Sequence, residues 1–385
     1  MIASIVRSLA VSALLLLAPA STHTAEAQTV HQDYQERVSA RVIEVVEQYD
    51  RIIMGTQAST TVQQLRIQLT SGEKTGEVVA LHNDLLVLSV GDRIYVDRLV
   101  AIDGTEFYLF KDVERRWPMV VITIIFVLLV LVLSGWQGAR ALGSLALSIA
   151  AILFVLIPAL LKGYSPALTS LFISGVILAA TLFLTHGFKA RVTIAFLGTF
   201  VAVFITCLIA WIWVSWMRLT GFSDDASVYL NFATGGTLDL SGLLLGSIII
   251  GLLGLLDDVS ITQSSVVQEL KRANQSLGFW QLYRSALRVG KDHVGSLVNT
   301  LSLAYVGAAL PLILLYASSA EDIWLSLNQE VIAVEILRII VGSIGLVLAV
   351  PLVTGLAAWY FKDKVVEAGD NHDHECGHGH HHHHH

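Results

Sequence analysis

The stretch GLLLGSIIIGLLGLLDDVSITQSSVVQEL, residues 242–270, decides how the rest of the chain can be arranged. It begins like a transmembrane helix, but its apolar run ends at two adjacent carboxylates, Asp257 and Asp258, followed by hydroxyl and amide side chains. A charge near hydrocarbon costs roughly 2.5 kcal/mol or more, so such residues usually face a bundle interior or an aqueous path. We therefore expect a buried polar site here. The alternative is an ordinary cytoplasmic helix end with two solvated acids.

Small residues recur along the same stretch. Gly251 and Gly254 precede the acids, and Gly242 and Gly246 lie earlier in the same apolar run. Glycines let neighbouring helices approach closely and make local unwinding easier. We therefore expect a helix break at Gly251 and Gly254. The spacing of Gly242 and Gly246 also permits a helix interface, either within one chain or between two chains of a homo-oligomer.

The composition identifies a polytopic α-helical membrane protein. Hydrophobic residues make up 54% of the chain and charged residues only 14%, whereas soluble domains carry about 25% charged residues. The two cysteines, Cys207 and Cys376, are too far apart in the expected topology to form a disulfide, so no redox role is expected.

The N-terminal third is expected to lie outside the membrane. Residues 1–27 have the charged start, apolar stretch and A-x-A site of a cleaved signal peptide; an uncleaved signal anchor is the alternative. In residues 28–114, short alternating or β-branched runs are separated by turn residues such as Ser71-Gly72 and Gly91-Asp92. This pattern predicts a small OB-like β-barrel. Its sparse aromatic and scattered basic residues disfavour nucleic-acid binding.

Residues 115–362 are expected to form a seven-helix transmembrane domain. The first apolar segment ends near Gly135, and others follow at about 141–161, 166–184, 192–216, 240–257, 297–317 and 332–360. Each is about long enough to cross roughly 30 Å of hydrocarbon. Lys and Arg are enriched in the loops 134–140, 185–191 and 258–295, which places these loops and the C-terminus in the cytoplasm and the β domain outside. The expected location is the bacterial inner membrane.

One loop segment, near 278–291, is amphipathic. Its apolar residues fall on one helical face and its basic residues on the other, as in a helix lying at the membrane surface. A hinge that couples the fifth and sixth spans is the alternative.

The last two spans carry further polar candidates. Asn299 lies at the inner end of the sixth span. Glu335 and Arg338 are three residues apart in the seventh, where mutual pairing is the cheapest way to bury either charge. Pro351 is expected to break or kink this helix; a simple packing kink is the alternative.

Residues 363–385 form a His-rich cytoplasmic tail, and the histidine run 380–385 has the appearance of an expression tag. Upstream of it, imidazole and thiolate groups at close spacing predict zinc or similar metal binding, with nonspecific chelation as the alternative. These residues are His372, His374, Cys376 and His378.

Three segments resemble, in order, the C-terminal signature blocks of YibE/F-like multipass membrane proteins. They are GLLGLLDDVSITQSSVVQEL from Gly251, GKDHVGSLVNTLSLAYVGAALPLIL from Gly290 and EVIAVEILRIIVGSIGLVLAVPLVTGL from Glu330. The resemblance implies a strand domain followed by a multipass membrane domain. It also implies an acid preceded by a glycine-rich run, at the position of Asp257 or Asp258.

These residues predict a transporter or exchanger that moves a small ion or solute. Asp257 and Asp258 would bind a cation or proton, because carboxylates beside breakable helices can replace lost hydration. Polar coordination is assigned to Gln263, Ser264 and Asn299, and an interhelical latch or gate to Glu335 and Arg338. A bound cation is the one cofactor that such a site would hold, and the bilayer and the solute are the expected partners. An anion contacted by Arg338 or Lys291 is an alternative cargo.

A second function class is a noncatalytic assembly or sensor protein whose β domain binds a partner outside the membrane. An enzyme is not expected, since the chain contains no H-E-x-x-H, G-x-S-x-G or phosphate-loop motif. Asp257 and Asp258 also point about 100° apart on a helix and do not form a ready-made protease dyad.

Overall fold

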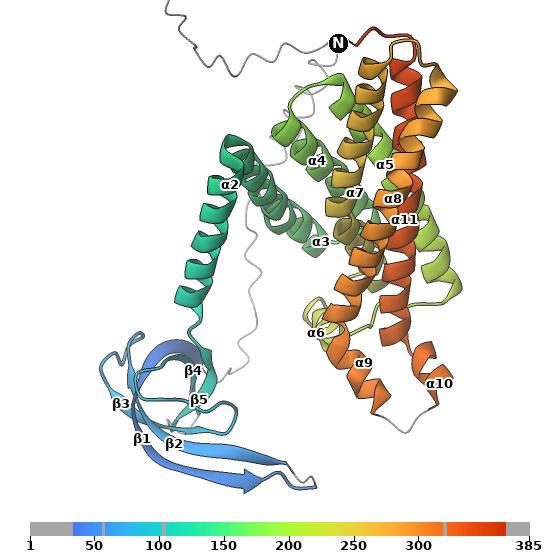
Figure 1. Cartoon of the computed structure of the whole chain (residues 1–385). Coiled ribbons are helices and arrows are strands. Elements are labelled where there is room, and N and C mark those ends of the chain that lie inside the picture. The colour runs from blue at the N-terminus through green and yellow to red at the C-terminus, as the bar shows by residue number, and fades with distance from the viewer. Residues whose placement is uncertain (1–33, 56–57, 102–104, 319–321, 367–385) are drawn as a thin grey trace, which may run out of the picture. The chain divides into compact units, whose positions relative to one another are not determined.

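The structure, a computed structural model, describes residues 34–55, 58–101, 105–318 and 322–366. These residues form two compact units that divide after Ile125, a β-barrel and a helical unit, which are shown in Figure 1. The signal peptide predicted at 1–27 lies outside the described residues. So do the four predicted metal ligands of the tail, His372, His374, Cys376 and His378.

The first unit is a closed five-stranded barrel, which confirms the barrel expected from the sequence. Its strands follow the order β1-β2-β3-β5-β4, and β3 pairs with β5 in parallel. Alternate residues of β2, such as Leu65, Ile67 and Leu69, point into the barrel core and are fully buried. The strands are β1 (Tyr34–Ile52), β2 (Ser59–Leu69), β3 (Val78–Asn83), β4 (Arg93–Val100) and β5 (Glu106–Val113).

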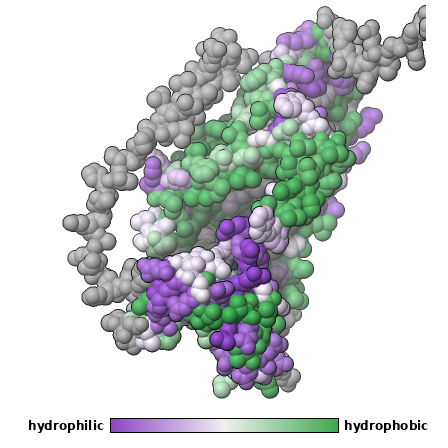
Figure 2. Space-filling view, turned by 90° about the vertical axis from the view of Figure 1, so that its left-hand side faces the viewer, coloured by the Kyte–Doolittle hydropathy of each residue, from purple (hydrophilic) through white to green (hydrophobic). Residues whose placement is uncertain are grey.

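The remainder of the described chain is mainly helical. Its elements are α2 (Arg116–Ala151), the π-helical turn η1 (Ile152–Leu156), α3 (Ile157–Leu161), α4 (Pro166–His186), α5 (Ala190–Trp216), α6 (Asp225–Ala233), α7 (Leu240–Ala273), α8 (Phe279–Ala308), α9 (Leu310–Ala317), α10 (Ile323–Asn328) and α11 (Glu330–Phe361). Helix α7 lies at the centre, in contact with α4, α5, α8 and α11. Much of the surface of this unit is hydrophobic, as Figure 2 shows for one face.

Five helices in the described part of the chain are long and apolar enough to cross a membrane, or six if the bent pair α8 and α9 counts as one span. The sequence predicted seven. With the bent pair included, the count is one lower than predicted because Arg116–Leu161, taken as one helix, contains two of the predicted segments. Its α2 part has a non-helical Gly135 (φ 52°, ψ −134°), a left-handed conformation that glycine adopts at little cost. The chain turns back at this point (Figure 1).

The predicted surface helix near 278–291 is instead the first half of α8, which continues to Ala308 and then bends by 64° into α9. Its apolar side chains, including Leu282 and Ala286, are buried against other helices. Gly290 makes this contact close, because a Cβ there would lie 2.7 Å from both Gln263 and Val350. The amphipathic face therefore packs on α7 and α11.

The predicted helix breaks are also absent from the described helices. Helix α7 runs without interruption through Gly251 and Gly254, and α11 continues past Pro351. A Cβ at Gly251 would lie 2.6 Å from the Tyr305 hydroxyl oxygen of α8, so this glycine makes room for a neighbouring helix. At Gly251 the small size of glycine therefore matters for helix packing, and the helix does not unwind there.

Candidate functional site

The two adjacent acids of α7 lie in different surroundings. Asp258 is exposed and lines a pocket. Asp257 is partly buried and lies beside Thr181 of α4, and its Oδ1 is buried without a hydrogen-bond partner. Neighbouring side chains on an α-helix point about 100° apart, so the doubled acid places one carboxyl group in the pocket and one toward α4.

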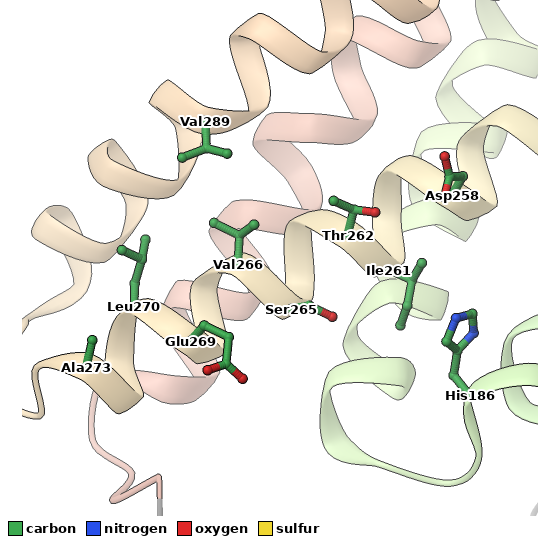
Figure 3. Close-up of a pocket in the computed structure, with 10 residues that line it drawn as sticks. All are labelled: His186, Asp258, Ile261, Thr262, Ser265, Val266, Glu269, Leu270, Ala273 and Val289. Carbon is green, nitrogen blue, oxygen red and sulfur yellow. The ribbon is translucent and has the colours of Figure 1, made fainter. Parts of the chain in front are cut away.

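The pocket has a volume of about 620 Å³. Figure 3 shows most of its lining on one side of α7, with His186 at the end of α4 and Val289 on α8. The lining combines two acids and an imidazole with two hydroxyl groups and an apolar floor. It consists of His186, Asp258, Ile261, Thr262, Ser265, Val266, Glu269, Leu270, Ala273 and Val289.

Buried polar atoms without a hydrogen-bond partner lie on α4, α5 and α7, and one of them belongs to the pocket-lining His186. In the described part of the chain, five of the six such side-chain atoms belong to the end of α4, the start of α5 and the middle of α7. Each atom of this kind costs about 1–3 kcal/mol, and a water, ion or ligand is the usual explanation. The five are His186 Nδ1, Arg191 Nε, Asp257 Oδ1, Ser260 Oγ and Gln268 Oε1.

The charges near His186 come from three other helices. Arg140 of α2, Arg191 of α5 and Asp258 of α7 all act on it electrostatically. Arg140 is held in place by donating from Nε to the Leu184 carbonyl oxygen at 2.7 Å. The imidazole therefore has two cations and one acid in its neighbourhood.

A family model described as "YibE/F-like protein" matches residues 122–363. The chain belongs to the YibE/F-like protein family. This match confirms the resemblance found in the sequence and covers every helix that lines the pocket, but not the strands of the barrel. Comparisons with curated proteins and with solved structures gave no match.

In this YibE/F-like protein, three predicted coordinating residues lie away from the pocket lining. Gln263 is buried and donates from Nε2 to the Ala286 carbonyl oxygen at 2.8 Å, and Ser264 donates from Oγ to the Arg191 carbonyl oxygen at 2.8 Å. Both side chains therefore join α7 to its neighbours. Asn299 is exposed on α8.

Glu335 and Arg338 form an ion pair along α11, with each side chain 23% exposed. Neither residue lines the pocket. The pair therefore does not belong to the site around Asp258.

Sequence reasoning missed His186, Arg140 and Arg191. Arg140 and Arg191 were counted as ordinary positive charges of cytoplasmic loops, and His186 falls just after a predicted span. The sequence did contain one indication. All three residues lie in the loops 134–140 and 185–191, which were predicted to be on the same side of the membrane as Asp257 and Asp258.

The site offers two kinds of chemistry. Carboxylate and hydroxyl oxygens suit cations, and an imidazole near a carboxyl group suits proton exchange. Within the described ranges, no three His, Cys, Asp or Glu residues lie close enough together to hold a metal ion.

Proposed function

We propose that this YibE/F-like protein is a membrane transporter or exchanger that moves a small ion or solute, coupled to a cation or proton through Asp257 and Asp258. The observation that supports it is the pocket at Asp258, which two acids, an imidazole and two hydroxyl groups line, on a helix that also carries buried polar atoms without hydrogen-bond partners. Groups of this kind inside a helical membrane unit typically mark ion or substrate pathways.

The depth of the acids fits this proposal. From Leu240 to Asp258 helix α7 rises roughly 27 Å at about 1.5 Å per residue, close to the roughly 30 Å thickness of hydrocarbon. Asp258 would then lie near one membrane face, with the pocket opening beyond it. The positive charge of the loops assigns that face to the cytoplasm, with the barrel outside and the Glu335–Arg338 pair acting as a latch.

A thermal-stability screen of tag-free protein tests the proposal. The ligands are sodium, potassium, magnesium, calcium, manganese, zinc and phosphate, together with a pH series. A ligand that binds only the folded state adds about 2.7 kcal/mol of stability at a hundredfold excess over Kd. We expect one ligand, or a change of pH, to stabilise the parent but not Asp258→Asn.

The matched control for this screen is Ser241→Ala, which alters a partly exposed side chain at the start of the same helix. It should respond like the parent. If the parent responds to no solute and to no change of pH, and Asp257→Asn and Asp258→Asn both behave like it, the acids are structural and the proposal fails.

One observation favours the assembly or sensor function as a second candidate. Strand β1 pairs with β4 only up to Arg41, so among the described strands its second half pairs on one side only, with β2. Val46, Tyr49 and Ile52 in this half are exposed, and Met54 beyond it is 99% exposed. Such an edge can accept a strand of another protein. A Val46→Lys, Ile52→Lys variant should then lose a co-purifying partner and keep its response to ions.

A further inference from the structure

We propose that α7 binds one dehydrated monovalent metal cation where it packs on α4, through the Asp257 carboxylate and the hydroxyl oxygens of Ser260 and Thr181. This inference rests on the proposed transport function. It names the class of the ion and two further residues that contact it. It also places the ion in the protein interior, beside the open pocket at Asp258.

Ser260 is the residue that singles out this place. It is fully buried, and its hydroxyl oxygen has no hydrogen-bond partner. Thr199, Thr206 and Thr354 are buried as deeply, but each donates its hydroxyl to the carbonyl oxygen four residues earlier, at 2.6–2.7 Å. That bond is an ordinary way to satisfy a hydroxyl group within a helix. The Ser260 hydroxyl does without it and is therefore available to a ligand.

Asp257 lies one turn before Ser260 on the same helix. Side chains three residues apart are neighbours on a helix, with Cβ atoms about 5–6 Å apart, so a single ion can contact both. Asp257 Oδ1 is buried without a hydrogen-bond partner, and no ion pair joins Asp257 to another described residue. A buried carboxylate in this state needs a compensating positive charge.

Thr181 of α4 supplies the third oxygen. Its side chain lies beside Asp257, and its hydroxyl proton is already used, since Oγ1 donates to the Leu178 carbonyl oxygen at 3.1 Å. The lone pairs of this oxygen therefore remain for a cation. Leu178 and Ile261, one turn from Thr181 and Asp257 respectively, are buried in one apolar cluster. These side chains shield the ion from bulk water.

The ligand set favours a monovalent ion. With one carboxylate, a monovalent cation gives a neutral site, whereas a divalent cation would leave a net positive charge in the interior, which is costly. Ca²⁺ also takes about 6–8 oxygen ligands, and Mg²⁺ usually keeps several waters. Within the described ranges, no three His, Cys, Asp or Glu residues gather into a metal site. Hydroxyl and carboxylate oxygens in a small, dry place suit an ion such as Na⁺.

Asp258 provides the route to this site. It lines the pocket, and its side chain points about 100° away from that of Asp257 on the same helix. A cation attracted by the acids of the pocket can therefore lose its water as it passes from Asp258 to Asp257. The pocket is then the entrance, and the contact of α7 with α4 is the binding site.

Equilibrium binding of radiolabelled Na⁺ to the tag-free protein in nanodiscs tests the inference. The parent should bind one ion per chain, Asp257→Asn should lose binding, and Ser260→Ala should bind roughly tenfold more weakly. Ser247→Ala is the matched control, because it is the same change on the same helix but its hydroxyl already donates to the Leu244 carbonyl oxygen at 2.7 Å. It should bind like the parent.

Thermal unfolding of Ser260→Ala separates a ligand from a structural group. Removing a buried hydroxyl that has no partner also removes the cost of its desolvation. Without sodium, the variant should therefore unfold at the same temperature as the parent or higher, and only the rise caused by sodium should shrink. A lower unfolding temperature without sodium would show that the hydroxyl is structural and would overturn its assignment.

The outcomes separate this inference from the proposed function. If Na⁺ does not bind but a change of pH stabilises the parent through Asp258, the coupling ion is a proton, and transport survives without the buried cation. Binding that Asp258→Asn abolishes and Asp257→Asn leaves intact would place the ion in the open pocket. Stronger competition by Ca²⁺ or Mg²⁺ than by K⁺ or Li⁺ would overturn the monovalent class. If neither pH nor any ion affects the parent, both proposals fail.

Discussion

Arg98 holds the polar side of the barrel together. It is 6% exposed and donates from Nη2 to Glu106 at 2.8 Å and from Nη1 to Glu36 at 3.2 Å. Lys74 also lies 2.7 Å from Glu106, and Tyr108 donates its hydroxyl to the same carboxylate at 2.9 Å. The Arg98 hydrogen bond, with those of Lys74 and Tyr108, lowers the pKa of Glu106 to about 2. Burial, with the hydrogen bond to Glu106, raises the pKa of Tyr108 to about 12.

The lowered pKa of Glu106 predicts an acid-sensitive barrel. An unfolded Glu has a pKa of about 4.3, so the stabilisation is fully present above this value and is lost as pH falls toward about 2. Glu106→Gln should therefore unfold at a lower temperature than the parent at neutral pH, and the difference should shrink below pH of about 4.3. Thermal unfolding followed by circular dichroism at several pH values measures this. Glu47→Gln, at an exposed residue of β1, should match the parent throughout; a pH-independent gap for Glu106→Gln would contradict the prediction.

Single residues also show the limit of sequence reasoning. The acids were found from the sequence because carboxylates after an apolar run are rare. Lys271 was counted as a cytoplasmic surface charge, but it is 4% exposed and donates to three carbonyl oxygens, including that of Lys362 at 2.7 Å. The contact of Lys271 with Lys362 and the position of His186 beside the α7 pocket both bring together residues that are distant in sequence. No local sequence pattern reveals such contacts.

At the scale of elements, the apolar segments were predicted well, but their ends and bends were not. Glycine signals small size and flexibility equally, so the sequence did not reveal that Gly251 permits contact with Tyr305, while Gly135 adopts a positive φ. The amphipathic pattern of 278–291 suits a lipid surface or a helix groove. In the structure this segment packs in a groove between helices, because Gly290 has no side chain and leaves room for Gln263 and Val350.

Two glycines of the helical unit should respond oppositely to alanine. At Gly198 of α5, an added Cβ would lie 2.7 Å from Val353 Cγ2 and 3.0 Å from its Cα, whereas at Gly254 of α7 nothing lies within 4 Å. Overpacking costs about 1–3 kcal/mol, and alanine gains up to about 1 kcal/mol in helix propensity. Gly198→Ala should therefore lower the free energy of unfolding, and Gly254→Ala should preserve or raise it, in denaturant titrations in detergent. Equal stability of the two variants would show that α5 and α11 are less closely packed.

At the scale of the whole molecule, composition and strand pattern were enough to predict a barrel followed by apolar helices. The number of crossings was harder, since Arg116–Leu161 and the bent pair α8 and α9 each allow more than one count. The chain-reversing bend at Gly135 favours two crossings for Arg116–Leu161. The topology that we propose has the barrel outside and seven crossings in total, so that the C-terminus lies in the cytoplasm.

Cysteine labelling in intact cells tests this topology. In a Cys207→Ser, Cys376→Ser background, Lys111→Cys at the end of the barrel should react with a membrane-impermeant maleimide from outside. Gln137→Cys, beside the bend of α2, and Lys291→Cys, on α8, should react only after the cells are opened. In the proposed topology, an odd number of membrane crossings separates each of these residues from the barrel. All three replaced side chains are exposed, so burial does not protect them. Labelling of Gln137→Cys from outside would mean that the first arm of α2 does not cross the membrane. The loop containing Lys291 and the face carrying Asp258 would then have to be reassigned as well.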